Sequence, residues 1–410
     1  MLTKKNTLNY AVHIINGLLP IILIVYLNSK SSLTFMGYFF KALAIIGTVQ
    51  LFVDYGFNFS GIRSYRDLSS AEKPLQARVS FFSNLIIAKL IIGTVIIFGY
   101  IIYSLLLLAQ FNVADLSYVV FGVLFSVANF NWFFYATDKS LEFSLILLFL
   151  RILSFFILFF TPLSLDNLLV INFAPFFISN LALLVFLLYQ KLPRQRITMP
   201  TIEIIPTFKS GWRIFANGVI ISFLTMSWPI FFSRLISIEM VGVYGLADRI
   251  SRGLRNLIGP LPFFVLSRHG HYTADFKFSN LNSKYVRIFG FLLIAVPLMF
   301  MLVPSSILGV VLKGEVIDYR QLLNLYSLGF IAGALNSLFY TYLITASKES
   351  LYLIYFIVAY TLGVALGLLL GTYIFMPLFV EGILCVMLCS KFIMEYKRAV
   401  FVTINKNEKW

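Results

Sequence analysis

The chain has 410 residues, of which 60% are hydrophobic and only 12% are charged, and its mean hydropathy is +0.90. Apolar segments long enough to cross a bilayer recur from one end to the other, which excludes a soluble globular domain and predicts an all-α polytopic membrane protein. Basic loops explain the net charge of +15 better than nucleic-acid binding does, and Cys385 and Cys389 suggest neither a metal site nor a disulfide framework.

About twelve transmembrane helices are predicted, and the charge of their connections alternates along the chain. The predicted spans are roughly 8–28, 35–61, 80–107, 117–136, 143–162, 168–189, 212–232, 241–266, 287–311, 321–344, 351–373 and 376–396. Most loop lysines and arginines fall in every second connection, and the opposite connections carry only Lys30, Arg234, Lys313 and Arg320. The positive-inside rule then predicts that both termini are cytoplasmic.

The two halves of the chain resemble each other at an offset of half its length. This offset superposes Gly37 on Gly242 and Ala42 on Ala247. Each half has an even number of spans, so the two copies share one orientation about an axis along the membrane normal. We therefore predict two pseudo-symmetric six-helix bundles around a central cationic cavity. The predicted divisions are a first bundle over 1–190, a basic cytoplasmic linker over 191–211, a second bundle over 212–396 and a cytoplasmic tail over 397–410.

Six basic residues lie deep within the predicted spans. An arginine that faces lipid near the middle of the bilayer costs at least ~2.5–3.5 kcal/mol. We therefore predict that these residues face a wet, protein-lined cavity that attracts an anion. They are Lys41, Lys89, Arg151, Arg249, Arg252 and Arg255. The alternative for the first three is a structural ion pair with an intramembrane acid such as Asp54.

The stretch from Val241 to Arg268 is the most clearly amphipathic of the chain. At about 100° per residue in a helix, Asp248 and Asn256 fall on the same stripe as the three arginines of this stretch. The alternative is a helix that lies on the cytoplasmic surface of the membrane. Because the alternation of loop charge requires a crossing here, we predict that this helix spans the bilayer.

A second polar stripe is predicted on the span over 35–61. Gln50, Asp54 and Asn58 recur there at spacings of three and four residues, which places them on one helix face. We predict that Gln50, Asn58 and Asn256 line the cavity. Asp54 and Asp248 are predicted either to carry a coupling proton or sodium ion or to be structural acids. No cofactor and no metal site are predicted.

Three motifs resemble a known family. Leu51 to Arg63 resembles the Asp-aromatic-Gly-Phe-Asn…Arg signature that ends helix 2 in the repeat-unit flippases of O-antigen biosynthesis. Asn131 to Lys139 is similar to the tryptophan-aromatic turn after their helix 4, although Asn131 and Tyr135-Ala136 replace the proline and the Gln-Gly of the family. Val241 to Arg249 is similar to the opening of their helix 8.

This resemblance implies a transporter, not an enzyme, of the multidrug/oligosaccharidyl-lipid/polysaccharide exporter superfamily. Such flippases translocate undecaprenyl-diphosphate-linked oligosaccharides from the cytoplasmic to the periplasmic leaflet of the bacterial inner membrane, in lipopolysaccharide and polysaccharide biosynthesis. The implied partners are this cargo, membrane lipid, and a polysaccharide polymerase with its chain-length machinery. No nucleic acid is expected.

Two other classes of protein are weighed against the flippase. A multidrug exporter of the same superfamily would be expected to have a net acidic cavity, whereas here the predicted cavity bases outnumber Asp54 and Asp248. A membrane-embedded polymerase or glycosyltransferase would need a sizeable outer loop with catalytic groups. The outer connections of this chain are short and hold no pair of carboxylates positioned for chemistry.

Overall fold

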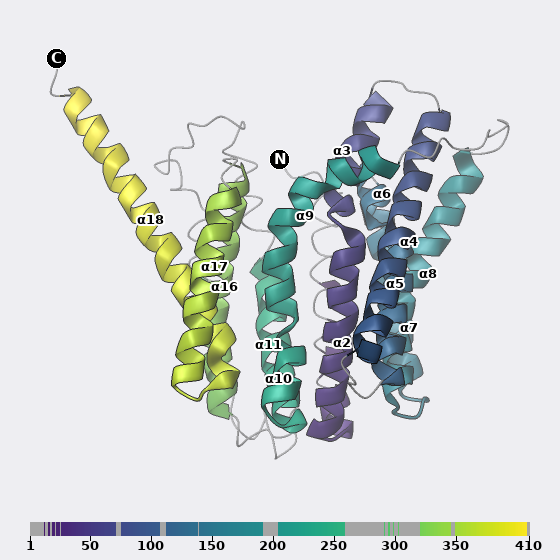
Figure 1. Ribbon diagram of the computed structural model, residues 1–410, viewed down its shortest axis with the longest axis horizontal. Coiled ribbons are helices and arrows are strands. Elements are labelled where there is room, and N and C mark those ends of the chain that lie inside the picture. Colours follow the sequence, from purple (N-terminus) through teal and green to yellow (C-terminus); the bar gives the residue numbers. More distant parts are fainter. Residues whose placement is uncertain are drawn as a thin grey trace. The chain divides into compact units, whose positions relative to one another are not determined.

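The computed structural model describes most of the chain as helices (Figure 1). The described residues are 26–70, 75–106, 112–137, 139–191, 204–258, 320–345 and 349–407, with single positions and short runs between 12 and 24 and between 291 and 302. Within these residues there is no strand. The predicted all-α fold class is confirmed. The predicted span over 287–311 and much of the one over 8–28 lie outside the described residues.

Seven helices among the described residues are long and apolar enough to cross a membrane. They are Leu33–Asp54, Ala77–Leu106, Val113–Ala136, Ser140–Leu158, Leu165–Val185, Ser350–Leu369 and Tyr373–Met394. Large apolar side chains lie exposed on these helices; Phe149, for example, is 66% exposed and Leu369 is 83% exposed. Apolar exposure on this scale suits a surface that meets lipid and not water, which agrees with a multi-pass membrane protein.

The chain divides into two compact units. The first contains Met1–Leu23 and Ser31–Gly242, and the second contains Ile24–Lys30 and Val243–Trp410. Helices of the first unit are α2 (Leu33–Asp54), α3 (Phe57–Ser70), α4 (Leu75–Leu106), α5 (Val113–Val127), α6 (Asn131–Ala136), α7 (Ser140–Leu158), α8 (Leu165–Lys191), α9 (Ile204–Met226) and α10 (Trp228–Leu235). Helix α11 (Ile238–Ile258) begins in the first unit and continues in the second, which also holds α16 (Arg320–Thr345), α17 (Glu349–Leu369), the 3-10 turn η2 (Tyr373–Phe375) and α18 (Met376–Asn407). The predicted bundles and the cavity between them stay predictions.

The second predicted span, over 35–61, is two helices and not one. Helix α2 ends at Asp54, and Tyr55 and Gly56 follow with φ angles of 44° and 72°. Glycine adopts this left-handed backbone at little cost, whereas tyrosine does so at about 1–2 kcal/mol. The ring of Tyr55 is stacked on Phe215 of α9 at a centroid distance of 4.3 Å. Because the chain turns here, Asn58 belongs to α3 and does not continue the stripe of Gln50 and Asp54.

The motif from Asn131 to Lys139 forms part of the core of the first unit, through the short helix α6. Trp132 of α6 is 1% exposed and packs edge-on against Tyr65 and Phe81 and at a tilt of 37° against Phe82. A Cβ on Gly61 would lie 2.9 Å from the Trp132 ring, so only glycine lets α3 approach this closely. The motif therefore fixes α3 and α4 around the turn between α5 and α6.

Residues half a chain apart meet where α2 crosses the start of α11. The hydroxyl of Thr34 donates to Glu239 Oε1 at 2.9 Å. A Cβ on Gly37 would overlap the carbonyl oxygen of Ile238, and a Cβ on Gly242 would overlap that of Leu33. Gly37 and Gly242 are the pair that the sequence repeat superposes, and both are glycines at this close helix crossing.

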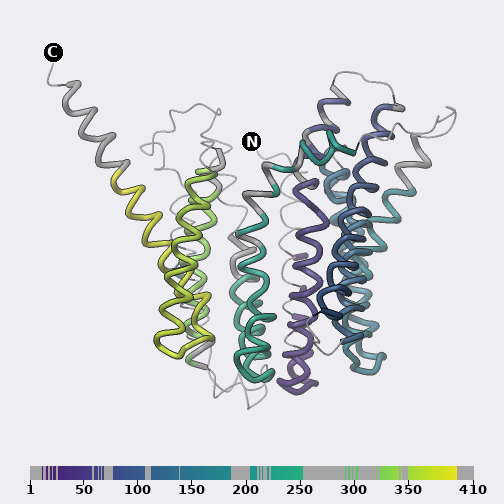
Figure 2. Tube along the Cα trace, viewed as in Figure 1, coloured from purple at the N-terminus to yellow at the C-terminus, as the bar shows by residue number. Residues whose placement is uncertain are grey.

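In the first unit, α9 and α10 pack on α2 (Figure 2). Glu239 follows α10 in the chain and lies in the first turn of α11, before the predicted span over 241–266. Its own backbone N–H and the hydroxyls of Thr34 and Ser237 hydrogen-bond the carboxylate and hold the pKa of Glu239 below its usual range. The start of α11 is thus anchored to α2 by an ionised side chain.

Candidate functional site

Lys89 of α4 is the most deeply buried of the predicted cavity bases whose side chains the structure describes. Its side chain is 1% exposed, and Nζ lies 2.7 Å from Asp54 Oδ1. The ammonium also donates to the carbonyl oxygens of Ser126 and Asn129, at 3.0 and 3.2 Å. All three of its protons are therefore used. This is the structural ion pair that the sequence analysis named as the alternative for Lys89.

The helix break explains why Asp54 and Lys89 meet. Asp54 is the last residue of α2, and the two carbonyls that Lys89 contacts lie at the end of α5 and just beyond it, where helical carbonyls lack intrahelical partners. The hydroxyl of Ser126 donates to Asp54 Oδ1 at 2.8 Å. A lysine in this place neutralises one acid and satisfies the end of a helix at once. Asp54 itself stays partly accessible, at 17% exposure.

Lys41 of α2 is also paired. Its Nζ lies 3.0 Å from Asp115 Oδ2 and 3.2 Å from Oδ1, and both side chains are about one-fifth exposed. Asp115 is in the first turn of α5, where Asn112 caps the helix by accepting from the N–H of Ala114. Asp115 is not among the predicted site residues because the fourth predicted span begins at residue 117. The Asn-x-x-Asp sequence at 112–115 is the helix-start signal that could have revealed it.

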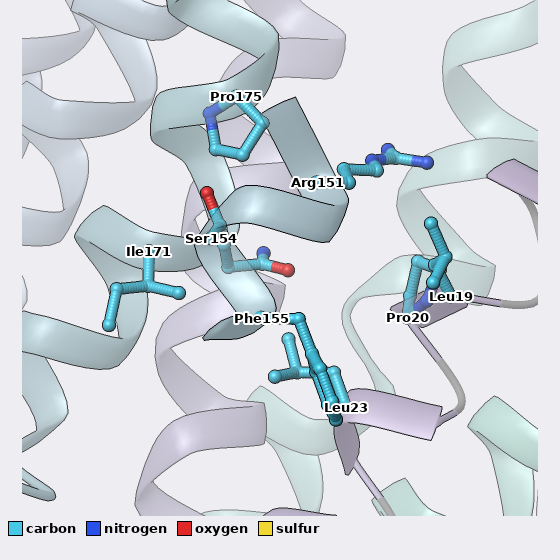
Figure 3. A pocket seen from close by; sticks show the side chains of 9 residues that line it. Leu19, Pro20, Leu23, Arg151, Ser154, Phe155, Ile171 and Pro175 are labelled. Atoms are coloured by element: carbon cyan, nitrogen blue, oxygen red, sulfur yellow. The ribbon is translucent and has the colours of Figure 1, made fainter. Parts of the chain in front are cut away.

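Arg151 of α7 lies beside an open cavity within the first unit (Figure 3). Its Nη1 donates to the main-chain carbonyl of Asn16 and lies 3.5 Å from Asn16 Oδ1. Among the described residues, no carboxylate pairs with Arg151. The cavity is small and is lined by Leu19, Pro20, Leu23, Arg151, Ser154, Phe155, Ile171, Asn172 and Pro175.

The second unit holds the two arginines of α11 that the structure describes. Arg252 Nε lies 2.7 Å from Asp248 Oδ2, one helical turn away. Arg249 forms no hydrogen bond or ion pair with the described residues, although Asp248 and Arg252 act on it electrostatically. Glu381 of α18 also acts on Arg252. Glu381 is not among the predicted site residues. The sequence feature that could have revealed it is that it is a lone acid within the predicted span over 376–396.

The remaining predicted residues are only partly visible. Gln50 is half-buried on α2, and its Nε2 has no hydrogen-bond partner among the described residues. Asn58 lies in α3, and Arg255 and Asn256 lie in α11, but their side chains are outside the description. The structure thus brings Lys89 to Asp54 and Arg252 to Asp248 and leaves Arg151 and Arg249 unpaired among the described residues. Their role in binding a substrate stays a prediction.

Solved structures of transporters share this fold. The chain is similar to an inward-facing multidrug resistance MATE family transporter of the MOP superfamily, with a TM-score of 0.65 and 11% identity over 97% of this chain and 99% of that one. It is also similar to the eukaryotic MATE transporter AtDTX14, with a TM-score of 0.51 and 13% identity over 95% of each chain. At these identities the likeness concerns the fold alone.

No curated protein matches the chain. A protein family described as "Polysaccharide biosynthesis protein" matches residues 2–266. The matched region includes all three motifs named above and both arginines of α11 that the structure describes. Because this match covers more than half of the 410 residues, the chain belongs to the polysaccharide biosynthesis protein family.

Proposed function

We propose that this protein translocates undecaprenyl-diphosphate-linked oligosaccharide repeat units, of the O-antigen type, across the bacterial inner membrane by alternating access. The observation that carries the proposal is that neither Arg151 nor Arg249 forms an ion pair with a carboxylate among the described residues. A guanidinium within a bundle of membrane helices is costly unless an anion or a polar partner accompanies it. An anionic cargo supplies that partner.

The diphosphate is the part of this cargo that cannot cross hydrocarbon alone. Arginine suits it because the planar guanidinium binds phosphate oxygens with two parallel hydrogen bonds. Membership of the polysaccharide biosynthesis protein family supports a carbohydrate cargo. A polymerase with its chain-length machinery would receive the repeat unit on the far leaflet.

Pairing within the described residues disfavours a cation-exporting multidrug transporter. A cationic drug needs carboxylates that are not already neutralised, yet Asp54, Asp115 and Asp248 each form an ion pair with a lysine or an arginine. The transporter fold is compatible with both cargoes. The arrangement of charge favours the anionic one.

The test is deletion of the gene, followed by complementation with arginine variants. We expect the deletion to accumulate a lipid-linked glycan on the cytoplasmic face, and Arg249→Ala and Arg252→Ala to restore less than about a tenth of the surface polysaccharide, since a hydrogen bond to a charged group is worth ~1.5–3 kcal/mol. Arg249→Lys should restore it only in part, because lysine cannot bind phosphate bidentately.

The matched control for these variants is Lys139→Ala, which removes a base from an exposed ion pair with Glu142 and should complement fully. Normal surface polysaccharide in both arginine variants and in the double variant, at normal protein levels, contradicts the proposal. Normal polysaccharide in the deletion strain together with sensitivity to cationic drugs would instead identify a drug exporter.

Energy coupling is proposed to use Asp54 or Asp248, by a proton or a sodium ion. Both carboxylates are accessible, at 17% and 15% exposure, although each is paired with a base. Transport should then change with pH or sodium concentration in the wild type. The double variant Asp54→Asn with Lys89→Met keeps the cluster neutral, and an unchanged pH and sodium response in it removes Asp54 from this role.

A further inference from the structure

We infer that the ammonium of Lys89 occupies a built site for a monovalent cation. The wild-type protein closes this site with its own side chain, and loss of that side chain opens it to potassium, sodium or a small ammonium ion. The site is the cluster of oxygens around Lys89 Nζ, which belong to Asp54, Ser126 and Asn129. The inference goes beyond the proposed function and does not rest on it, because it concerns the cation that Asp54 holds and not the cargo.

Oxygen atoms converge on one point where α2, α4 and α5 pack on one another (Figure 1). Lys89 Nζ lies 2.7 Å from Asp54 Oδ1, 3.0 Å from the Ser126 carbonyl oxygen and 3.2 Å from the Asn129 carbonyl oxygen. The hydroxyl of Ser126 donates to the same carboxylate oxygen at 2.8 Å. A carboxylate with neutral carbonyl and hydroxyl oxygens is the kind of ligand set that binds a hard metal cation.

Two helix ends meet at this cluster. Helix α2 ends at Asp54, and α5 ends at Val127, between the two residues whose carbonyls contact Lys89. The C-terminus of a helix carries a partial negative charge equivalent to roughly half an electron, which attracts cations. In secondary transporters, the C-terminal ends of interrupted helices coordinate sodium ions or protons. Here the lysine ammonium contacts groups at both ends.

The surroundings require a counter-charge for Asp54. Val53 and Phe130, which adjoin the cluster in the chain, are 0% and 7% exposed, and Lys89 is 1% exposed. In such apolar surroundings a carboxylate without a cation is strongly disfavoured. Asp54 itself is 17% exposed, so an ion from solution can reach the carboxylate once the lysine side chain is removed.

The distances and the charge define the class of cation. The 2.7–3.2 Å between Lys89 Nζ and its three oxygens exceeds the distances of about 2.3–2.6 Å for calcium and about 2.0–2.1 Å for magnesium. A divalent ion would also leave an excess positive charge beside a single carboxylate. A monovalent ion close in size to ammonium, such as potassium, fits this cluster directly, and sodium fits when the oxygens move closer.

A tethered ammonium cannot diffuse away, so this helix junction stays neutral at any concentration of free ions. A coupling role for Asp54 therefore requires the ammonium of Lys89 to be exchanged for a free cation. Replacement of Lys89 by alanine makes that exchange permanent, and it leaves the carboxylate and both main-chain carbonyls in the chain. The substitution thus isolates the site from the side chain that fills it.

The test compares full-length wild type with Lys89→Ala in detergent, in choline chloride and then at equal ionic strength in potassium, sodium or propylammonium chloride. Propylammonium replaces the atoms that the substitution removes. We expect Lys89→Ala to melt several degrees below wild type in choline chloride and to regain most of this loss as any of the three cations is added, because a ligand of the folded state stabilises it. It should also bind radiolabelled rubidium, a substitute for potassium, whereas wild type should not.

Lys41→Ala is the matched control, because it removes another paired lysine of the same unit. The described hydrogen bonds of the Lys41 ammonium go to the Asp115 carboxylate alone, at 3.0 and 3.2 Å, so this variant should melt at the same temperature in every salt. Lys89→Met fills the space without a charge and should lose stability that no cation restores. Lys89→Ala combined with Asp54→Asn should bind no rubidium.

A folded Lys89→Ala protein whose melting temperature and rubidium binding ignore the choice of cation contradicts the inference. An equal response of Lys41→Ala, or rubidium binding by wild type that Asp54→Asn abolishes, does the same. Rescue by propylammonium but by neither metal ion overturns the assignment to metal cations. A Lys89→Ala protein that folds in none of the salts also overturns the inference, because no free cation then replaces the ammonium.

These measurements use no cargo, so the site and the proposed function can fail separately. If Lys89→Ala gains a cation site but gene deletion accumulates no lipid-linked glycan, the proposed function fails and the cation site stands. If the deletion accumulates this glycan while Lys89→Ala ignores every cation, the proposed function stands and the cation site fails.

Discussion

Lys89 and Arg151 are both basic residues within membrane helices of the first unit, yet their surroundings are opposite. Lys89 is 1% exposed, and Asp54 and two main-chain carbonyls use all its donors. Arg151 lies at the edge of a cavity and donates to the main-chain carbonyl of Asn16, without a carboxylate partner among the described residues. The first arrangement is complete without a ligand, and the second is not.

The comparison shows that a base at membrane depth does not by itself indicate a binding site. The number of its donors that protein groups already satisfy separates a structural base from one that is available to cargo. By this criterion Lys41 and Lys89 are structural, and Arg151 and Arg249 are available. The expected effects of substitution on stability should follow the same division.

The largest effect is expected from Asp54→Asn, which leaves Lys89 buried without its counter-charge. Breaking a buried pair by removing one partner costs about 3–5 kcal/mol, so the melting temperature of the detergent-purified protein should fall markedly. The control is the double variant Asp54→Asn with Lys89→Met, which removes both charges and should recover most of the loss. An equal loss in the single and double variants would mean that pairing is not what stabilises this cluster.

A smaller loss is expected from Ser126→Ala. Its hydroxyl donates to Asp54 Oδ1 at 2.8 Å, and hydrogen bonds to charged groups contribute about 1.5–3 kcal/mol. The carbonyl of Ser126 that accepts from Lys89 is unaffected by this substitution. Thermal unfolding followed by circular dichroism measures the effect. No shift in melting temperature would show that the ammonium of Lys89 alone neutralises Asp54.

Arg151→Gln should change stability by no more than about 1 kcal/mol, because the lost hydrogen bond is offset by removal of an unpaired charge. The same variant should lose binding of the lipid diphosphate, so function and stability separate at this residue. Measuring both on one preparation provides the contrast with Asp54→Asn. A loss of stability as large as that of Asp54→Asn would assign Arg151 to the structural class.

The smallest effect is expected at the turn before α7. The Lys139 and Glu142 side chains are 40% and 39% exposed, and their charged atoms lie 3.2 Å apart. Exposed pairs of this kind contribute about 0–1 kcal/mol, so Lys139→Ala should leave the melting temperature nearly unchanged at physiological salt. A large shift that persists at high salt would show that exposure is a poor guide to the strength of pairing in this protein.

The sequence by itself determined the membrane class, the positions of most helices and the presence of bases within them. Hydropathy and helical periodicity are local properties that need only about twenty consecutive residues. The repeat also identified Gly37 and Gly242 as equivalent, and the structure brings both into the crossing of α2 and α11. Family membership agrees with the carbohydrate context that the three motifs implied.

Only the tertiary structure decided which bases are neutralised. Lys89 meets an acid 35 residues away, and Lys41 meets one 74 residues away, and no local pattern encodes which faces of two distant helices will touch. The break at Tyr55 likewise depends on the ring of Phe215, which belongs to a helix far along the chain. The ion pairs depend on packing between helices, whereas charge and hydropathy are properties of the sequence of each helix alone.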